Sequence, residues 1–305
     1  MAHSHSIALR DWGLMVLLSM IWGGSYLFVG IAVKDLSPLV IVLARVILAA
    51  SALLVMLMAS GATLPRGRAS WIAIIGLSVL NNVVPFTVIV TGQTMIASGL
   101  ASVINATSPL FGVAFIAAAG LEPLVARKVI GIVIGIMGVA VLKGGTDLLD
   151  GSQSIGILLC LGAAASYGAG GLWAKMKLKG IPPLSAATGQ LLCSSAIMVV
   201  PAFAFDNPAS LFHASAASWL ALLGLSLLAT SFAYLIFFRV VERAGPANVL
   251  LVTMMIPVSA IAMGYVVLHE TLELREIIGA LIIIGALVII DGRVVGLLRP
   301  RENAA

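Results

Sequence analysis

The chain alternates between long apolar stretches and short polar connections. Ten apolar runs can be traced, at residues 12–33, 37–58, 71–91, 98–120, 125–143, 153–174, 183–204, 216–238, 246–268 and 275–297. About 20 apolar residues are what a helix needs to cross the hydrocarbon core of a bilayer. The backbone polar groups of a spanning segment must be satisfied within it, so each run is predicted to be a transmembrane helix. No connection is long enough to hold a soluble domain.

The composition agrees with this pattern and excludes a soluble protein. Hydrophobic residues make up 61% of the chain and charged residues 10%, and the mean hydropathy is +1.16. Soluble domains carry about 25% charged residues. A membrane β-barrel is excluded because its strands are short and alternate between polar and apolar positions. The predicted fold class is therefore an all-α integral membrane protein, with the lipid bilayer as its immediate partner.

The basic residues predict the orientation of the chain in the membrane. If the N-terminus is cytoplasmic, thirteen lysines and arginines fall in the inner segments, against Lys34, Lys143 and Arg275 in the outer loops. Positive charge concentrates on the cytoplasmic side of membrane proteins, so ten spans with both termini inside are expected. The first run lacks a small-residue cleavage site and is interpreted as a retained span. The net charge of +5 predicts no nucleic-acid partner, because the basic residues lie between the apolar runs.

The two halves of the chain repeat one pattern. Five residues recur 148 positions later, so that Pro109, Glu122, Leu124, Arg127 and Gly131 are matched by Pro257, Glu270, Leu272, Arg275 and Gly279. We therefore predict two five-helix repeats, residues 1–148 and 149–305. Because five is an odd number of spans, the repeats must cross the membrane in opposite directions. Inverted repeats around a central substrate site are the plan of many secondary transporters.

Several short motifs point to a known family. They are Ile-Trp-Gly-Gly-Ser-Tyr at 21–26, Pro38 and Arg45 in the second run, Leu-Glu-Pro-Leu at 121–124, and His-Glu-Thr-Leu at 269–272. Together they resemble the drug/metabolite transporter superfamily, and in particular its EamA-type ten-helix permeases. The resemblance extends over essentially the whole chain, but it names no substrate. It implies a protein similar to the amino-acid and metabolite exporters of bacterial inner membranes. It also implies a cavity among the first, third, fourth, sixth, eighth and ninth helices.

Polar and aromatic residues inside the runs are the candidates for substrate binding. A buried polar group is costly unless it is paired or faces a cavity. The predicted substrate-binding residues are Trp22, Tyr26, Asn81, Asn82, Phe86, Asn105, Thr107, Tyr167, Tyr234 and Met255. Aromatic walls with amide donors suit a small zwitterion with an apolar side chain. The alternative is that the amides and hydroxyls join neighbouring helices and that the aromatic residues lie at the membrane interfaces.

Three prolines and one arginine have separate interpretations. Pro85, Pro109 and Pro257 each remove a helix hydrogen bond and are predicted to act as hinges, with static kinks as the alternative. Arg45 is the one full charge well inside a span. We interpret it as structural, capping helix carbonyls or reaching toward the outer face, because the second repeat has Gln190 at the matching position. Binding of a substrate carboxylate is the alternative.

The sequence also limits the energy source and the chemistry. It has no glycine-rich loop ending in a lysine, so ATP hydrolysis is not expected. No carboxylate lies in the middle of a run, which favours uncoupled transport over proton exchange through Glu122 and Glu270. Cys160 and Cys193 fall within runs and predict neither a disulfide nor a metal site. The four histidines lie at run ends or in loops, so no catalytic cluster, metal or cofactor is predicted, and an enzyme is not expected.

The hypothesis from the sequence is an inner-membrane secondary transporter that exports amino acids or related small metabolites by alternating access. A drug or other metabolite permease of the same superfamily is the nearest alternative. A channel or an intramembrane enzyme would be an answer of a different class. Glycines on the fifth and tenth runs offer a face for a homodimer, although a monomer is sufficient.

Overall fold

The computed structural model describes residues 9–144, 151–245 and 248–292, and these residues form helices and turns with no strand. The predicted boundary between the repeats at 148/149, the end of the tenth run at 297, and His3 and His5 lie outside the described residues. In the first half the helices are α1 (Leu9–Ala32), α2 (Pro38–Ala59), α3 (Arg68–Ser78), the π-helix η1 (Val79–Val83), α4 (Val84–Gly92), α5 (Ser98–Asn105), α6 (Ser108–Ala118) and α7 (Ala126–Lys143).

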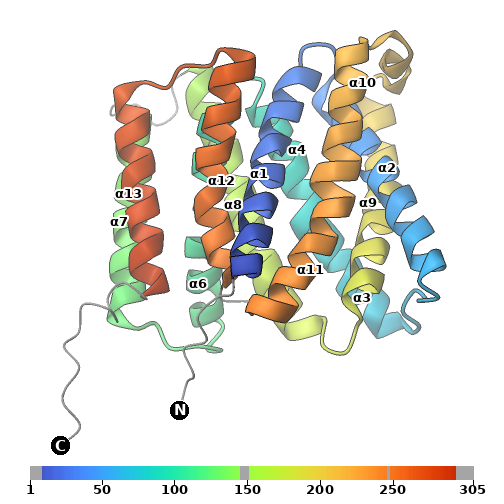
Figure 1. The fold of residues 1–305 in the computed structure, drawn as a ribbon, viewed down its shortest axis with the longest axis horizontal. Coiled ribbons are helices and arrows are strands. Elements are labelled where there is room, and N and C mark those ends of the chain that lie inside the picture. Colours follow the sequence, from blue (N-terminus) through green and yellow to red (C-terminus); the bar gives the residue numbers. More distant parts are fainter. Residues whose placement is uncertain (1–8, 145–150, 246–247, 293–305) are drawn as a thin grey trace, which may run out of the picture.

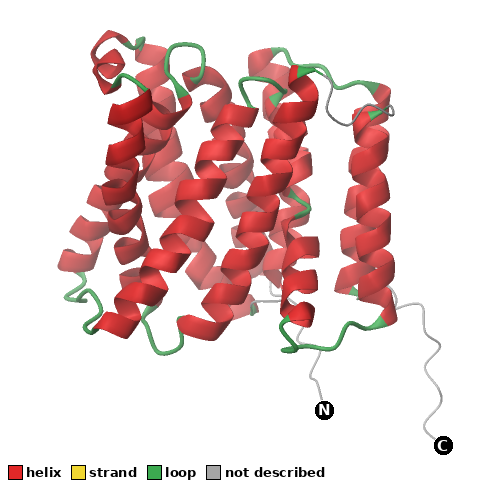
Figure 2. Ribbon diagram, turned by 180° about the vertical axis from the view of Figure 1, so that it is seen from behind, coloured by secondary structure: helices red, strands yellow, loops and turns green. Residues whose placement is uncertain are grey.

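The second half follows the same order. Its helices are α8 (Ser152–Lys177), α9 (Pro183–Phe205), the 3₁₀ turn η2 (Pro208–His213), α10 (Ala216–Leu223), the π-helix η3 (Gly224–Phe232), α11 (Ala233–Ala244), α12 (Val249–Met263), the π-helix η5 (Gly264–Leu268) and α13 (Leu274–Asp291). The connections lie at the two ends of one bundle (Figures 1 and 2). Figure 1 also shows that α1 begins and α13 ends at the same end of the bundle.

Within the described residues, eight helical runs are long and apolar enough to cross a membrane. The helices α7 and α13 are not among these eight, although each has 18 residues. Each carries three charged residues, all in its first or last turn. Lipid-facing side chains are apolar: Val55 is 66% exposed, Leu220 69% and Leu281 64%. Such a surface is stable in hydrocarbon and unfavourable in water, so the chain is a multi-pass membrane protein.

Helices of the two halves pack reciprocally. Counterparts pair with each other, α2 with α9 and α7 with α13. The other pairings come in matched sets: α1 packs on α12 as α8 packs on α6, and α1 packs on α10 and α11 as α8 packs on α3 and α4. Counterparts also run in opposite directions, as α7 and α13 do in Figure 1. Two similar halves that exchange their contacts in this way bury their apolar faces against each other along the middle of the bundle.

The glycines expected to offer a dimer face are used within the chain. A Cβ on Gly138 would lie 2.8 Å from Ile283 and 3.1 Å from the carbonyl oxygen of Gly279, and one on Gly131 would lie 3.0 Å from the carbonyl oxygen of Ala286. Only glycine lets α7 and α13 approach this closely. The small-residue face is therefore the contact between these two helices, apart from Gly285, which has nothing within 4 Å.

The third and eighth runs are each interrupted by a π-helix at matching depth. Pro85 is the second residue of α4, and its ring nitrogen has no hydrogen to donate to the preceding turn. The helix widens into η1 just before it. In η3 there is no proline, and the hydroxyls of Thr230 and Ser231 donate to carbonyls five residues earlier, on Leu225 and Ser226. Single-turn π segments are frequent at functional sites.

Candidate functional site

A cavity of about 660 Å³ lies between the two halves of the bundle. Its walls come from the helices expected to surround it, α1, α3–α4, α5–α6, α8, η3–α11 and α12. Two further helices, α2 and α9, contribute Arg45 and Gln190. A volume of this size is typical of sites for small organic molecules.

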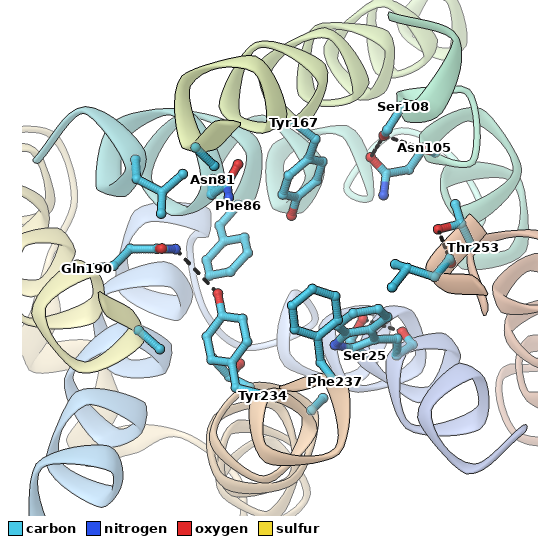
Figure 3. A pocket seen from close by; sticks show the side chains of 18 of the residues that line it. Ser25, Asn81, Phe86, Asn105, Ser108, Tyr167, Gln190, Tyr234, Phe237 and Thr253 are labelled. Atoms are coloured by element: carbon cyan, nitrogen blue, oxygen red, sulfur yellow. Dashed lines mark hydrogen bonds between the residues drawn. The ribbon is translucent and has the colours of Figure 1, made fainter. Parts of the chain in front are cut away.

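Seven of the ten residues predicted to bind substrate line this cavity: Trp22, Tyr26, Asn81, Phe86, Asn105, Tyr167 and Tyr234. They come from both repeats, and Figure 3 shows the side chains of Tyr167 and Tyr234 projecting into the same space from opposite walls. Their role in binding remains a prediction. The structure brings them together around one space, as a shared site requires.

The other three predicted residues do not line the cavity. Asn82 is fully buried between α9 and η1, where it donates to Ser194 (3.0 Å) and accepts from Gln190 (2.8 Å). Thr107 donates to the carbonyl of Ile104 at the junction of α5 and α6. Met255 lies on α12 outside the cavity lining. For Asn82 the structure supports the alternative, an interhelical hydrogen bond.

Aromatic rings form one side of the cavity. Trp22 and Phe237 have ring centroids 5.8 Å apart, and Tyr234 stacks on Phe238 at 6.1 Å with the planes 13° apart. Gln190 donates its side-chain amide to the hydroxyl of Tyr234 across 3.4 Å (Figure 3). These contacts hold the rings in place within the cavity wall, because Gln190, Phe237 and Phe238 line the cavity as well.

Polar groups on the opposite side are partly committed to their own helices. The hydroxyl of Ser108 donates to the carbonyl oxygen of Asn105 at 2.5 Å and lies 3.4 Å from its side-chain oxygen, so the amide nitrogen of Asn105 points toward the cavity (Figure 3). Thr253 donates to the carbonyl of Val249 (3.3 Å). The side-chain oxygen of Asn81 is buried with no hydrogen-bond partner among the described residues. That oxygen packs against Gly170 of α8, so the amide group that faces the cavity on this side is the nitrogen of Asn105.

Arg45 has neither of the structural roles assigned to it from the sequence. It is only 9% exposed, and its Nε donates to the hydroxyl of Thr230 at 3.0 Å, not to a helix carbonyl. Its guanidinium carbon lies 3.6 Å from the centroid of the Phe86 ring. The side chain lines the cavity and does not extend to a membrane surface.

The cavity reaches one end of the bundle. Its lining includes Leu178, Ile181 and Pro183, in and beside the connection between α8 and α9. That connection lies at the end where α1 begins (Figure 1). At the other end, Glu270 accepts from the backbone N–H of Ser98 (3.0 Å), from its hydroxyl (2.6 Å) and from the N–H of Gly99 (3.3 Å). This carboxylate caps the first turn of α5 and so joins the two repeats at that end.

The predicted hinges lie in different settings. Pro85 is the second residue of α4, just after η1, and Pro109 is the second residue of α6, just after the break between α5 and α6. Pro257 lies inside α12, which continues as an α-helix to Met263. Proline is tolerated inside transmembrane helices because neighbouring groups satisfy the freed carbonyl. Whether the three prolines act as hinges remains a prediction.

No acidic side chain lines the cavity among the described residues, and these residues contain no group of three or more histidines, cysteines or acids that could hold a metal. The sequence-derived candidates omitted Gln93, Ser25 and Phe237, which do line it. Gln93 donates to the carbonyl of Tyr26 at 2.9 Å and has its oxygen unpaired. Gln93 lies near the end of a span, where a polar residue is expected at the membrane interface. Only the packing of α4 against α8 places it in the cavity wall.

Both halves of the chain match the same protein family. The EamA-like transporter family matches residues 12–143 and again residues 154–291. The chain belongs to the EamA-like transporter family. Each match covers nearly all the helices of one repeat, in agreement with the reciprocal packing.

Two bacterial transporters are similar to the chain over most of its length. This EamA-like transporter is 26% identical over 269 residues to the uncharacterized transporter YoaV of Bacillus subtilis, covering 88% of this chain and 92% of that one. It is 28% identical to the uncharacterized inner membrane transporter YedA of Escherichia coli K12, covering 85% and 83%. A crystal structure superposes with a TM-score of 0.67 at 16% identity, over 95% of this chain and 99% of that one, and shows the shared fold. The protein is a membrane transporter and not an enzyme.

Proposed function

We propose that the protein exports amino acids or related small metabolites across a bacterial inner membrane by alternating access, from ten helices in two inverted repeats. The observation that carries this proposal is the cavity of about 660 Å³ between the repeats, with aromatic and amide walls. A small zwitterion with an apolar side chain fits such walls, since the rings pack on the apolar part and the amides hydrogen-bond the polar part.

The ten-span count rests on α7 and α13 together with the eight clear spans. Both are 18 residues long, and their charges at the ends can reach the headgroups. The close packing of α7 against α13 also agrees with two helices that both cross the membrane. An even count is in keeping with the start of α1 and the end of α13 lying at the same end of the bundle (Figure 1).

Both termini are proposed to be cytoplasmic. The connection after α8 carries Lys175, Lys177 and Lys179 in and beside it, and it lies at the end of the bundle where α1 begins. Concentrated lysine is typical of cytoplasmic loops. In this orientation the cavity reaches the cytoplasmic side, so the structure corresponds to an inward-facing state of the proposed cycle.

Alternating access requires one closed end at a time. The bonds of Glu270 to α5 join the repeats at the end opposite to the one that the cavity reaches. Release of these bonds, with closure around Leu178 and Ile181, would expose the same cavity to the other side. The π-helices and prolines supply places where half-helices can move without breaking the whole bundle.

The proposal is tested by counterflow in proteoliposomes, with a panel of labelled amino acids, nucleosides and cationic dyes. Saturable uptake of an amino acid, stimulated by the same compound inside, is expected. The variant Tyr167→Ala should raise KM about tenfold, because it removes a cavity wall. Tyr265→Ala is the matched control, since Tyr265 is 64% exposed outside the cavity. Saturable flux of dyes alone would indicate a drug permease, and conductance without saturation would indicate a channel.

Transport is proposed to be uncoupled from protons. Proton-coupled carriers commonly use buried acids as relays. None of the residues that line the cavity is acidic within the described part of the chain. Counterflow is therefore expected to persist when an ionophore collapses the proton gradient. Its complete loss would favour proton exchange instead.

A further inference from the structure

Arg45 is a buried cation in the wall of the transport cavity. It projects from α2, which was not among the helices expected to contribute, and it is 9% exposed. Three ion pairs among the described residues involve Glu122 and Glu273, at the two ends of the bundle. Arg45 thus has no carboxylate partner in the described part of the chain.

An unpaired charge in this position is costly. Burial of a cation in a low-dielectric interior carries a large free-energy penalty unless an anion or several acceptors compensate. Two contacts compensate in part: the hydroxyl of Thr230 accepts from Nε at 3.0 Å, and the Phe86 ring lies 3.6 Å from the guanidinium carbon. Neither removes the net charge.

The same two contacts orient the guanidinium. Thr230 holds one edge and Phe86 holds one face, so the plane of the group is set by neighbours on η3 and α4. No described residue accepts a hydrogen bond from the two terminal nitrogens. A planar fork with its terminal donors unused matches the two oxygens of a carboxylate.

We propose that Arg45 binds the carboxylate of the cargo, with Thr230 and Phe86 as positioning residues. This rests on the proposed function and narrows it to carboxylate-bearing molecules, with cationic drugs excluded by like charge. The second repeat has the neutral Gln190 at the matching position, where it donates to Asn82 and Tyr234. The cavity therefore has one anion site, and the cargo binds in one orientation although the scaffold is repeated.

The test compares an acid with its neutral-headed analogue in counterflow. Each amino acid that supports flux is assayed beside its primary amide, which keeps the side chain and the ammonium group and loses only the carboxylate charge. In the wild type, the amide is expected to have a KM higher by about thirtyfold or more, since an unpaired buried partner of an ion pair costs at least that factor. In Arg45→Gln the ratio of the KM of the amide to the KM of the acid should fall to near one, because the acid binds more weakly.

Three further variants make the result specific. Arg45→Lys keeps the charge but loses the planar fork, so it should give an acid-to-amide ratio between those of the wild type and Arg45→Gln. Thr230→Val should reduce the preference by a smaller factor, since it frees the guanidinium edge. Ser51→Ala is the control on the same helix, because Ser51 is exposed and bonds only to the carbonyl of Ile47. The acid-to-amide ratio is measured within each variant, so a lower amount of folded protein does not alter it.

Two results would overturn the inference while leaving the transporter proposal intact. One is a wild type that moves amides as well as acids, and the other is an Arg45→Gln variant that keeps the wild-type ratio. If no compound in the panel gives counterflow, the proposed function itself fails, and the inference fails with it.

Discussion

Two turns of the molecule occupy equivalent places in the repeats and behave differently. Glu270, in the turn before α13, reaches across to the first repeat and accepts three hydrogen bonds at the start of α5. Glu122, in the turn before α7, is exposed and forms ion pairs with Lys175 (2.5 Å) and Lys128 (3.0 Å). Charge-assisted bonds to backbone donors in a half-buried site are stronger than exposed ion pairs. The turn that contains Glu270 therefore joins the repeats firmly, and the turn that contains Glu122 joins them weakly.

The receiving residues explain the difference. A Cβ on Gly264 would lie 2.6 Å from Glu270 and 2.9 Å from the hydroxyl of Ser98, so the glycine makes room for this carboxylate. The residue 148 positions before Gly264 is Ile116, and the residue 148 positions after Ser98 is Pro246, which has neither an N–H nor a hydroxyl. A repeated glutamate therefore does not imply a repeated contact.

The largest effect is expected for Glu270→Ala. This variant leaves the first turn of α5 without its acceptor, and a hydrogen bond to a charged group contributes about 1.5–3 kcal/mol. The free energy of unfolding should fall by about 2 kcal/mol, measured as loss of melting temperature in detergent. Glu122→Ala is the matched control, and equal destabilisation by both variants would contradict the comparison.

The next effect is expected for Gly264→Ala. The added methyl group must displace the carboxylate of Glu270 or the hydroxyl of Ser98, at an expected loss of about 1–2 kcal/mol. Gly162→Ala serves as the control, because a Cβ at that helical position meets nothing within 4 Å. Thermal unfolding should leave the control variant at or above the wild type, and the double variant with Glu270→Ala should lose little beyond the single one.

A smaller effect is expected for Ser98→Ala. It removes the 2.6 Å bond from the hydroxyl but keeps both backbone donors to Glu270. The expected loss is about 1 kcal/mol. Scanning fluorimetry of the purified protein checks the order of the three variants, and a loss as large as that of Glu270→Ala would mean that the backbone bonds contribute nothing.

The smallest effect is expected at Glu122. The hydrogen bond from Lys175, followed by that from Lys128, holds the pKa of this carboxyl below its ordinary range. A group with a lowered pKa in the folded protein contributes stability above its unfolded pKa of about 4.3, and this is lost as the pH falls through the folded value. Exposed pairs contribute at most about 1 kcal/mol. The difference in melting temperature between wild type and Glu122→Gln should be small at pH 7, decrease with salt, and vanish in acid.

A third loop supports the view that the polar contacts of the loops differ from one repeat to the other. Asp35, between α1 and α2, accepts from the backbone N–H of Ser215 (3.1 Å) and from the hydroxyls of Ser215 and Ser218 at the start of α10. The hydrogen bond from the Ser215 hydroxyl is the main reason that the pKa of Asp35 is lowered. The residue 148 positions before Ser215 is Gly67, which has no hydroxyl, and the residue 141 positions after Asp35 is Met176, which has no carboxylate.

Much of the architecture followed from the apolar pattern. Span length, the matches between halves and the membership of a transporter family were all predictable, because the bilayer requires long continuous helices and because duplicated packing needs duplicated residues. The candidate site was predictable in type, with seven aromatic and amide residues that meet in one cavity. The contacts of Arg45 with Thr230 and Phe86 were not predictable, because the matching position in the second repeat is the neutral Gln190 and a single charge gives no direction.

What the sequence determined by itself was the class of membrane protein, the repeat and the kinds of side chain available for a site. Only the tertiary structure decided which of two adjacent asparagines faces the cavity, since Asn81 lines it and Asn82 bonds to α9. Neighbouring residues on a helix point about 100° apart, so the choice depends on the rotation of the helix. Both asparagines lie in the π-helix η1, whose wider turn shifts that rotation relative to an ordinary helix. The direction in which a buried polar side chain points is therefore set by helix packing. The periodicity of apolar residues alone does not predict it.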